Sequence, residues 1–261
     1  MTTAMTGPGR AHGVPREAFR RLVQTEARLA LREPIGLVWG VGAPLLLTVI
    51  FGSIPSFQVP AAELAGLTYF DAYAPILMVF VLAMLAFLSL PYPLAGYREL
   101  GVLRRMSATP VSPSRLLAAQ LVVNLAMALI ALVLIILIGT TALGLRLPEH
   151  VPGFVLTLVL AAACLFSLGL VAAAIARTAR AAVAIGNALF FPLAFFAGLW
   201  LPQQAMPPVL RSIAEVTPTG AAVEALNSTL AGQWPSALPL LVLAGYTVVF
   251  SFVAVKRFRW E

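Results

Sequence analysis

Charged side chains are scarce in this chain. Only 10% of its 261 residues are charged, whereas 61% are hydrophobic. A water-soluble domain of this size carries roughly a quarter charged residues. No polar stretch between the apolar segments is longer than roughly 35 residues, which is too short for an ordinary separate domain. The composition excludes a soluble globular protein. It predicts a single transmembrane domain over residues 16–261, with a disordered start at residues 1–15.

Cysteine and lysine each occur once. Cys164 lies inside an apolar segment and cannot form an internal disulfide, so we interpret it as a packing residue. Lys256 is the only lysine, and no glycine-rich phosphate-binding loop surrounds it. Because such a loop needs a lysine to hold phosphates, we expect no nucleotide site in this chain. If this chain moves a solute uphill, the energy is therefore expected to come from another polypeptide.

Charge is also missing from the segments that are long enough to cross a bilayer. These are residues 35–54, 73–94, 116–145, 151–176, 181–201 and 235–255. None of them contains Asp, Glu, Lys, Arg or His. Ion-coupled carriers usually need a charged group at membrane depth, and enzymes need acids, bases or activated nucleophiles. The sequence therefore predicts an all-α protein with six spans, no catalytic residues and no metal site.

Ahead of the first span, residues 16–33 have the pattern of an amphipathic helix. Phe19 belongs to its apolar arc, whereas Arg28 and Arg32 fall on the opposite arc. Such a helix is expected to lie in the headgroup layer with its arginines toward anionic lipid. Glu26 is the exception inside the apolar arc. Its carboxylate either snorkels to water or pairs with an arginine between the second and third spans.

That arginine-rich stretch, residues 96–115, is called the basic segment. Apolar residues recur in it every three positions, which predicts a short amphipathic helix at residues 97–107. Pro110 and Pro113 end this helix because proline lacks an amide hydrogen and crowds the preceding turn. A stiff, charged element between two spans is well suited to binding by a soluble partner. The residues expected to make that contact are Arg98, Glu99, Leu100, Leu103, Arg104, Arg105 and Met106.

Residues 202–234, between the fifth and sixth spans, are too apolar for an ordinary loop. Prolines divide them into two short helical pieces, Pro208–Val216 and Thr219–Leu230. We expect these pieces to dip back into the outer leaflet as a re-entrant hairpin. Broken backbone is tolerated there only where protein or a wet cavity covers it.

Basic residues are distributed unevenly between the two sides of the six predicted spans. All lysines and arginines except Arg146 and Arg211 fall on one side. Because basic loops stay in the cytoplasm, both termini and the basic segment are expected to be cytoplasmic. This orientation, rather than nucleic-acid binding, accounts for the net charge of +7.

Several stretches carry a resemblance to a known family. They are YRELGVLRR at residues 97–105 with TPVSP at 109–113, the linker at 202–232, and REP at 32–34 ahead of a span that ends in Phe51-Gly52. From about Arg16 onward, the chain resembles the ABC-2 type transporter permeases. It is most similar to the daunorubicin-resistance and multidrug-efflux branch, near the nodulation-factor exporters. It departs from their pattern at Pro75-Ile76, where Pro-Gly is expected.

The resemblance implies a six-helix half-transporter with a cytoplasmic coupling helix at Arg98–Met106. It also implies two copies of a separately encoded ATP-binding subunit and a second permease, either an identical copy or a paralogue. In such permeases the second and fifth spans line a central path. On this sequence the path residues are Phe80, Phe87, Asn187, Phe190 and Phe195. The alternative interpretation is that the aromatic rings face lipid or pack in the core, and that Asn187 joins two helices.

Together these features predict the membrane subunit of an ATP-driven exporter in a bacterial plasma membrane. Uncharged, aromatic spans suit an amphipathic drug, antibiotic or lipid-like cargo better than a sugar or an ion. The alternative function is a non-transporting scaffold or sensor that recruits a cytoplasmic partner through the basic segment. An ion-coupled carrier is disfavoured because the spans lack charge.

Overall fold

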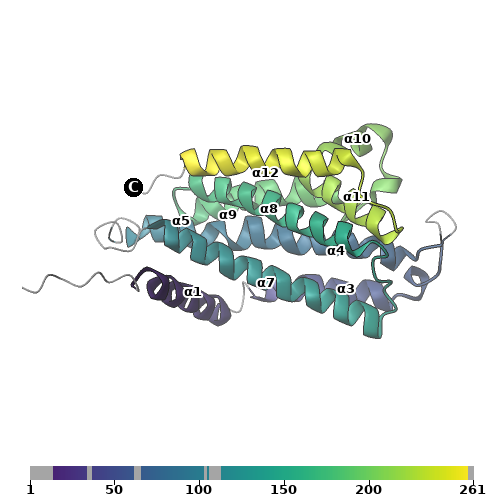
Figure 1. Ribbon diagram of the computed structural model, residues 1–261, viewed down its shortest axis with the longest axis horizontal. Helices are drawn as coiled ribbons and strands as arrows, with labels where there is room; N and C mark the ends of the chain where they lie inside the picture. The colour runs from purple at the N-terminus through teal and green to yellow at the C-terminus, as the bar shows by residue number, and fades with distance from the viewer. Residues whose placement is uncertain (1–13, 34–36, 62–65, 103–104, 106–112, 258–261) are drawn as a thin grey trace, which may run out of the picture.

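The computed structural model shows a bundle of helices (Figure 1) and describes residues 14–33, 37–61, 66–102, 105 and 113–257. Within these ranges the backbone is helical apart from turns and one isolated β-bridge between Pro60 and Thr68. Five helical stretches are long and apolar enough to cross a membrane, and a further apolar helix, Val38–Ser53, is shorter. The chain is therefore an all-α, multi-pass membrane protein, as its sequence predicts.

The five long stretches follow the second to sixth predicted spans, with ends shifted by a few residues. They are Tyr69–Glu99, α7 (Pro113–Ala142), α8 (Val151–Ile175), α9 (Ala179–Ala197) and α12 (Ala237–Arg257). At the first predicted span, a π-helical turn, η1 (Val38–Gly42), continues into α3 (Ala43–Ser53). Two single 3₁₀ turns, η2 (Pro55–Phe57) and η5 (Gln203–Ala205), occur in the connections.

The second span is longer than predicted at both ends. It consists of α4 (Tyr69–Met84), a π-helical turn η4 (Leu85–Ser89) and α5 (Pro91–Glu99). It begins before residue 73 because Thr68 and Asp71 form a reciprocal cap, each side chain accepting the other's backbone N–H. At the other end, Pro91 offers no amide hydrogen. The π turn, in which the Leu90 N–H bonds to the Leu85 carbonyl, absorbs this break and lets the helix continue.

This continuation corrects the helix expected at residues 97–107. Residues 97–99 form the last turn of α5, which is followed by Leu100 and Gly101. Gly101 has a φ of +66°, in the left-handed region that favours glycine and ends helices. Val102 and Arg105 are helical again, and the rest of the expected helix lies outside the described residues.

The middle of the second span forms the centre of the bundle. Its side chains are almost completely buried, Leu77 and Phe87 among them, and α3, α7, α8, α9 and α11 (Pro218–Leu230) pack around it. Two of these helices approach η4 through glycine. A Cβ atom on Gly169 of α8 would overlap the Ala86 carbonyl oxygen, and one on Gly186 of α9 would overlap the Phe87 carbonyl oxygen.

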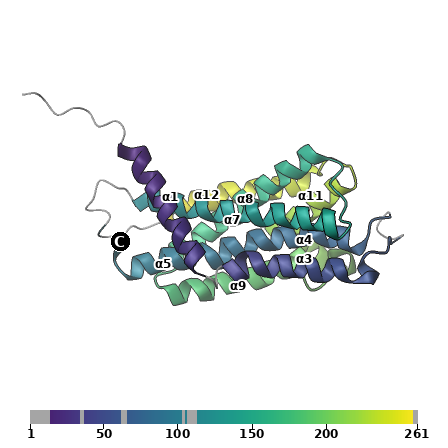
Figure 2. The same cartoon turned by 90° about the horizontal axis from the view of Figure 1, so that it is seen from below.

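The two ends of the bundle carry different elements. α1 (Val14–Arg32) packs on α7 and lies obliquely at the end of the bundle where α5 and α12 end, with α12 on the opposite side of the bundle (Figures 1 and 2). α10 (Pro208–Val216) lies at the opposite end (Figure 1). The next helix, α11 (Pro218–Leu230), is buried against α8, α9 and α12. These two short helices match the predicted pieces, and their re-entry into the outer leaflet stays a prediction.

Candidate functional site

Three consecutive residues at the end of α5 join it to helices from distant parts of the chain. Tyr97 bonds to Glu26 of α1, which also bonds to α7. Arg98 reaches the end of α8, and Glu99 reaches the start of α9. The sequence predicts Arg98 and Glu99 to be contacts for a partner, yet both engage the same chain here. The last turn of α5 is thus a junction at the end of the bundle where α1 lies.

Glu26 is buried at the interface of α1, α5 and α7, with 5% of its surface exposed. The Tyr97 hydroxyl donates to both carboxylate oxygens, at 3.1 and 3.0 Å, and the Gln120 amide nitrogen donates to Oε2. Burial raises the pKa of Glu26 above its ordinary value, and these two hydrogen-bonding partners partly oppose the rise. The snorkelling interpretation is wrong, because this carboxylate faces protein. Its partners among the described residues are uncharged rather than arginines.

Elsewhere in α1 the predicted amphipathic pattern holds in part, since the apolar Leu29 and Leu31 are exposed. Phe19 is half-buried, whereas Arg28 and Arg32 are exposed. An exposed basic face beside a membrane span suits contact with anionic headgroups, which stays a prediction.

The turn between α8 and α9 is held from both sides by the end of α5. Arg98 Nη1 donates to the carbonyl oxygens of Ala173, at 3.0 Å, and Ala176. Glu99 Oε2 accepts the backbone N–H of Ala179 at 2.9 Å. Carbonyls at a helix C-terminus and amides at a helix N-terminus lack partners within the helix, and the helix dipole favours a cation at the first and an anion at the second. The two charges therefore complement the two helix ends that they contact.

Past this junction Leu100 and Arg105 of the basic segment are exposed, whereas Gly101 and Val102 are half-buried. Leu100 is 71% exposed, and the exposed Arg105 donates from its guanidinium to the Leu100 carbonyl at 3.1 Å. Leu103, Arg104 and Met106 lie outside the described residues. Leu100 and Arg105 are the described residues of the predicted docking surface that lie past the junction.

An apolar groove of about 420 Å³ opens between the first apolar helix and α9. Small-molecule sites in proteins commonly measure about 300–1,000 Å³. None of the lining side chains is ionisable, and Asn187 supplies their one amide group. The lining residues come from η1, α3, α4, η4, α9 and the segment after α9: Trp39, Ala43, Leu46, Leu47, Phe80, Met84, Leu88, Asn187, Phe190, Phe191, Leu199 and Trp200.

The structure brings three of the five predicted path residues together in this groove. Phe80 and Phe190 lie with their ring centroids 5.6 Å apart, and Asn187 lines the same groove. Phe87 is fully buried in the core, and Phe195 is half-buried with its ring against Phe196. Neither Phe87 nor Phe195 lines the groove.

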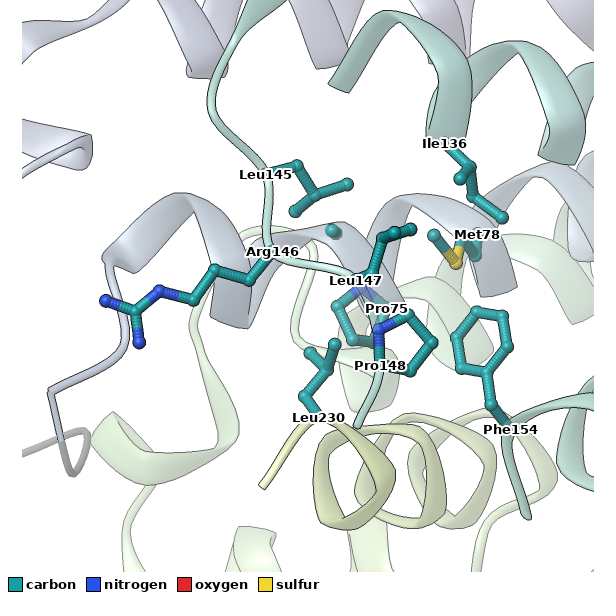
Figure 3. Close-up of a pocket in the computed structure, with 10 residues that line it drawn as sticks. Pro75, Met78, Ile136, Leu145, Arg146, Leu147, Pro148, Phe154 and Leu230 are labelled. Atoms are coloured by element: carbon teal, nitrogen blue, oxygen red, sulfur yellow. The ribbon is translucent and has the colours of Figure 1, made fainter. Parts of the chain in front are cut away.

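A second hollow, beneath the loop between α7 and α8, is too small for a substrate. Its volume of about 10 Å³ leaves room for at most one water molecule. Figure 3 shows it lined by Leu145 and Pro148 of the loop and by Pro75 of α4, while the Arg146 side chain extends away. Asp71 fastens this loop by accepting the Arg146 backbone N–H at 2.9 Å. The arrangement closes the end of the bundle opposite α1.

Among the described residues, no group of three His, Cys, Asp or Glu side chains is placed to hold a metal ion. The carboxylates of Glu26, Asp71 and Glu99 are instead occupied by hydrogen bonds to other parts of the fold.

The sequence reasoning missed two parts of these sites. Tyr97 and Gln120 were not singled out, although Gln120 and Asn124 lie one helical turn apart in an otherwise apolar span. The contribution of the first apolar helix to the groove was also missed. The sequence feature that indicates this contribution is the spacing of Trp39 and Leu46. They lie two helical turns apart and therefore share a face of the helix.

Comparison with known proteins gives a family-level match. The family described as ABC-2 type transporter matches residues 17–231, from within α1 to the end of α11. No curated protein matches the chain. The matched residues include both the α5 junction and the groove.

Proposed function

The chain belongs to the ABC-2 type transporter family, and from this premise we propose that it is the permease subunit of an exporter that moves an amphipathic drug, antibiotic or lipid-like molecule out of a bacterial cell. The family and the apolar helices support a membrane permease of an ABC-type transporter. Cargo and direction of transport are part of the proposal.

The apolar groove carries the proposal about the cargo. Its lining offers aromatic and aliphatic surface and the amide of Asn187, with no side chain to neutralise a charge. Transfer of an ion into such surroundings is costly, whereas apolar surface gains roughly 25 cal/mol for each Å² removed from water. A cargo with a large apolar part and a hydrogen-bonding group fits this chemistry.

Energy for transport is proposed to come from two copies of a separate ATP-binding subunit that bind ATP and Mg²⁺. Leu100 and the exposed Arg105 begin the surface on which that subunit docks. An exposed leucine beside the charged Arg105 offers an apolar anchor with a charged rim, as protein interfaces commonly do. A second permease, identical or paralogous, is proposed to complete the path.

The test is a paired efflux and co-purification assay in cells that carry the gene with its genomic neighbours. Leu100→Asp is expected to lower recovery of an ATP-binding subunit with the tagged permease, and to lower efflux of an amphipathic dye. Val209→Asp is the matched control, because Val209 is 72% exposed on α10 at the opposite end. Recovery of the partner with the unaltered permease, combined with efflux that is unchanged after deletion of the permease gene, would instead favour a scaffold or sensor.

A further inference from the structure

The α5 junction suggests how movement of the basic segment reaches the groove. We propose that Arg98 and Glu99 are positioning residues that fasten the α8–α9 turn to the end of α5. The basic segment and the start of α9 then move as one body during transport. This inference rests on the proposed function, because it assigns the segment that follows Glu99 to contact with an ATP-binding subunit.

Hydrogen bonds from Arg98 and Glu99 connect the end of α5 to α8 and α9. Glu99 is the last residue of α5, and the exposed Leu100 follows directly. The Glu99 carboxylate accepts the Ala179 N–H at the first turn of α9, while the neighbouring Arg98 holds carbonyls at the end of α8. Hydrogen bonds to charged groups are stronger than those between neutral groups. A displacement at Leu100 is thus passed to both helices through adjacent residues.

α9 connects the fastened turn to the groove. The helix runs unbroken from Ala179 to Ala197, and Asn187, Phe190 and Phe191 line the groove. Between the fastened end and these residues, Gly186 packs directly on the Phe87 carbonyl of η4. A stiff helix held at its first turn and pressed against the core at Gly186 pivots at that contact. Movement of its first turn therefore changes the groove.

The first arm of the test uses the whole chain in lipid nanodiscs and needs no ATP-binding subunit. Glu99→Ala is expected to speed hydrogen exchange at the Ala179 amide by about tenfold, as expected for loss of a hydrogen bond to a charged group. Glu99→Gln should restore protection, since its amide oxygen still accepts the N–H. Unchanged exchange in Glu99→Ala would overturn the fastening itself.

The second arm uses the native complex. Arg98→Ala and Glu99→Ala are expected to lower efflux about tenfold while recovery of the ATP-binding subunit and its ATP hydrolysis are retained. Glu99→Gln should recover efflux. Arg257→Ala is the control for charge removal, because Arg257 is exposed in the last turn of α12, at the same end. Normal efflux in both alanine variants, or loss of the subunit together with efflux, would overturn the proposal.

Cross-linking of thiols tests whether the contact between residues 99 and 179 stays closed during transport or has to open. In a Cys164→Ala background, cysteines at positions 99 and 179 are joined by a short bifunctional thiol reagent. Efflux restored by bridging supports a contact that stays closed, and efflux abolished by bridging overturns it. If Leu100→Asp leaves the ATP-binding subunit bound, the proposed docking fails, while the exchange measurement still decides whether α5 fastens the turn.

Discussion

The hydroxyl group of Tyr97 lies 3.0 Å from Glu26 Oε2 and joins residues that are 71 positions apart in the chain. Gln120 donates to the same oxygen from α7. One buried carboxylate thereby fixes an amphipathic helix to two spans. α1 is therefore held by a polar contact as well as by its apolar arc.

The ionisation of Glu26 should make this attachment depend on pH. Burial raises its pKa above the ordinary 4.5, so the folded chain binds the proton more tightly than the unfolded chain. The resulting stabilisation is complete below about pH 4.5 and is lost as pH rises through the higher pKa of the folded state. We expect Glu26→Gln to remove this decline. The measurement is the thermal unfolding midpoint in detergent across that pH range.

Glu26→Ala is the matched comparison. It leaves the Tyr97 hydroxyl and the Gln120 amide without their acceptor, at a cost of about 1–3 kcal/mol for buried groups of this kind. Its unfolding midpoint should therefore fall below that of Glu26→Gln at every pH. An unchanged pH dependence in Glu26→Gln would assign the decline to another group.

The glycines that face η4 should tolerate no side chain. A Cβ at Gly169 or Gly186 would overlap a backbone carbonyl oxygen, which cannot rotate away as a side chain does. Gly169→Ala and Gly186→Ala are expected to lose several kcal/mol and to yield little folded protein, as overpacking of a tight core does. Size-exclusion chromatography of fluorescent fusions measures the folded fraction.

Gly245 provides the internal control. It lies in α12, and a Cβ there meets no atom within 4 Å. Gly245→Ala should be neutral or stabilise the helix by up to about 1 kcal/mol, since alanine has the higher helix propensity. Equal losses in all three variants would show that close packing on η4 is not the cause.

The sequence predicted the elements whose physical signal is local. Uninterrupted apolar runs indicated the long helices, and prolines located α10 at Pro208–Val216 without error. The missing charge in the spans also predicted the apolar character of the groove. Each of these features depends on neighbouring residues, so one sequence was sufficient.

Features that depend on residues far apart were not predictable in the same way. Neither helical period nor composition indicates that Glu26 meets Tyr97, because that contact exists only after three helices have packed. The continuation of α5 to Glu99 was also hidden. The predicted span passed Pro91 and ended at Leu94, whereas the π turn before Pro91, packed on Gly169 and Gly186, lets the helix continue to Glu99.

The cap that starts α4 should be important for the opposite end of the bundle. Asp71 is fully buried and accepts hydrogen bonds from Thr68 and from the backbone of Arg146. Asp71→Ala is expected to cost about 1–3 kcal/mol, the range for leaving a buried hydrogen-bonding group without its partner. Asp71→Asn should cost less because its amide oxygen still accepts one bond. The measurement is the thermal unfolding midpoint of the parent protein and of both variants. Equal midpoints in all three would show that the buried cap does not contribute to stability.

Orientation is tested by reporter fusions. Fusions at Gly66 and Gly232 are expected to report the outside, and fusions at Ser107 and after Glu261 the cytoplasm. In the structure Gly66 and Gly232 are both turn residues with positive φ, so insertions there disturb no helix. Ser107 lies outside the described residues. A cytoplasmic signal at Gly232 would contradict the predicted topology.

Filling the groove should block export without unfolding the permease. Leu46 lines the groove and is 61% exposed, so a larger side chain there meets open space rather than core. Leu46→Trp is expected to reduce efflux of an amphipathic dye about tenfold, the effect of roughly 1.4 kcal/mol of lost binding. Leu241→Trp is the control, because Leu241 is 69% exposed on α12 and does not line the groove. Both variants should express and unfold like the parent protein. Equal efflux from both would place the cargo path elsewhere in the assembled transporter.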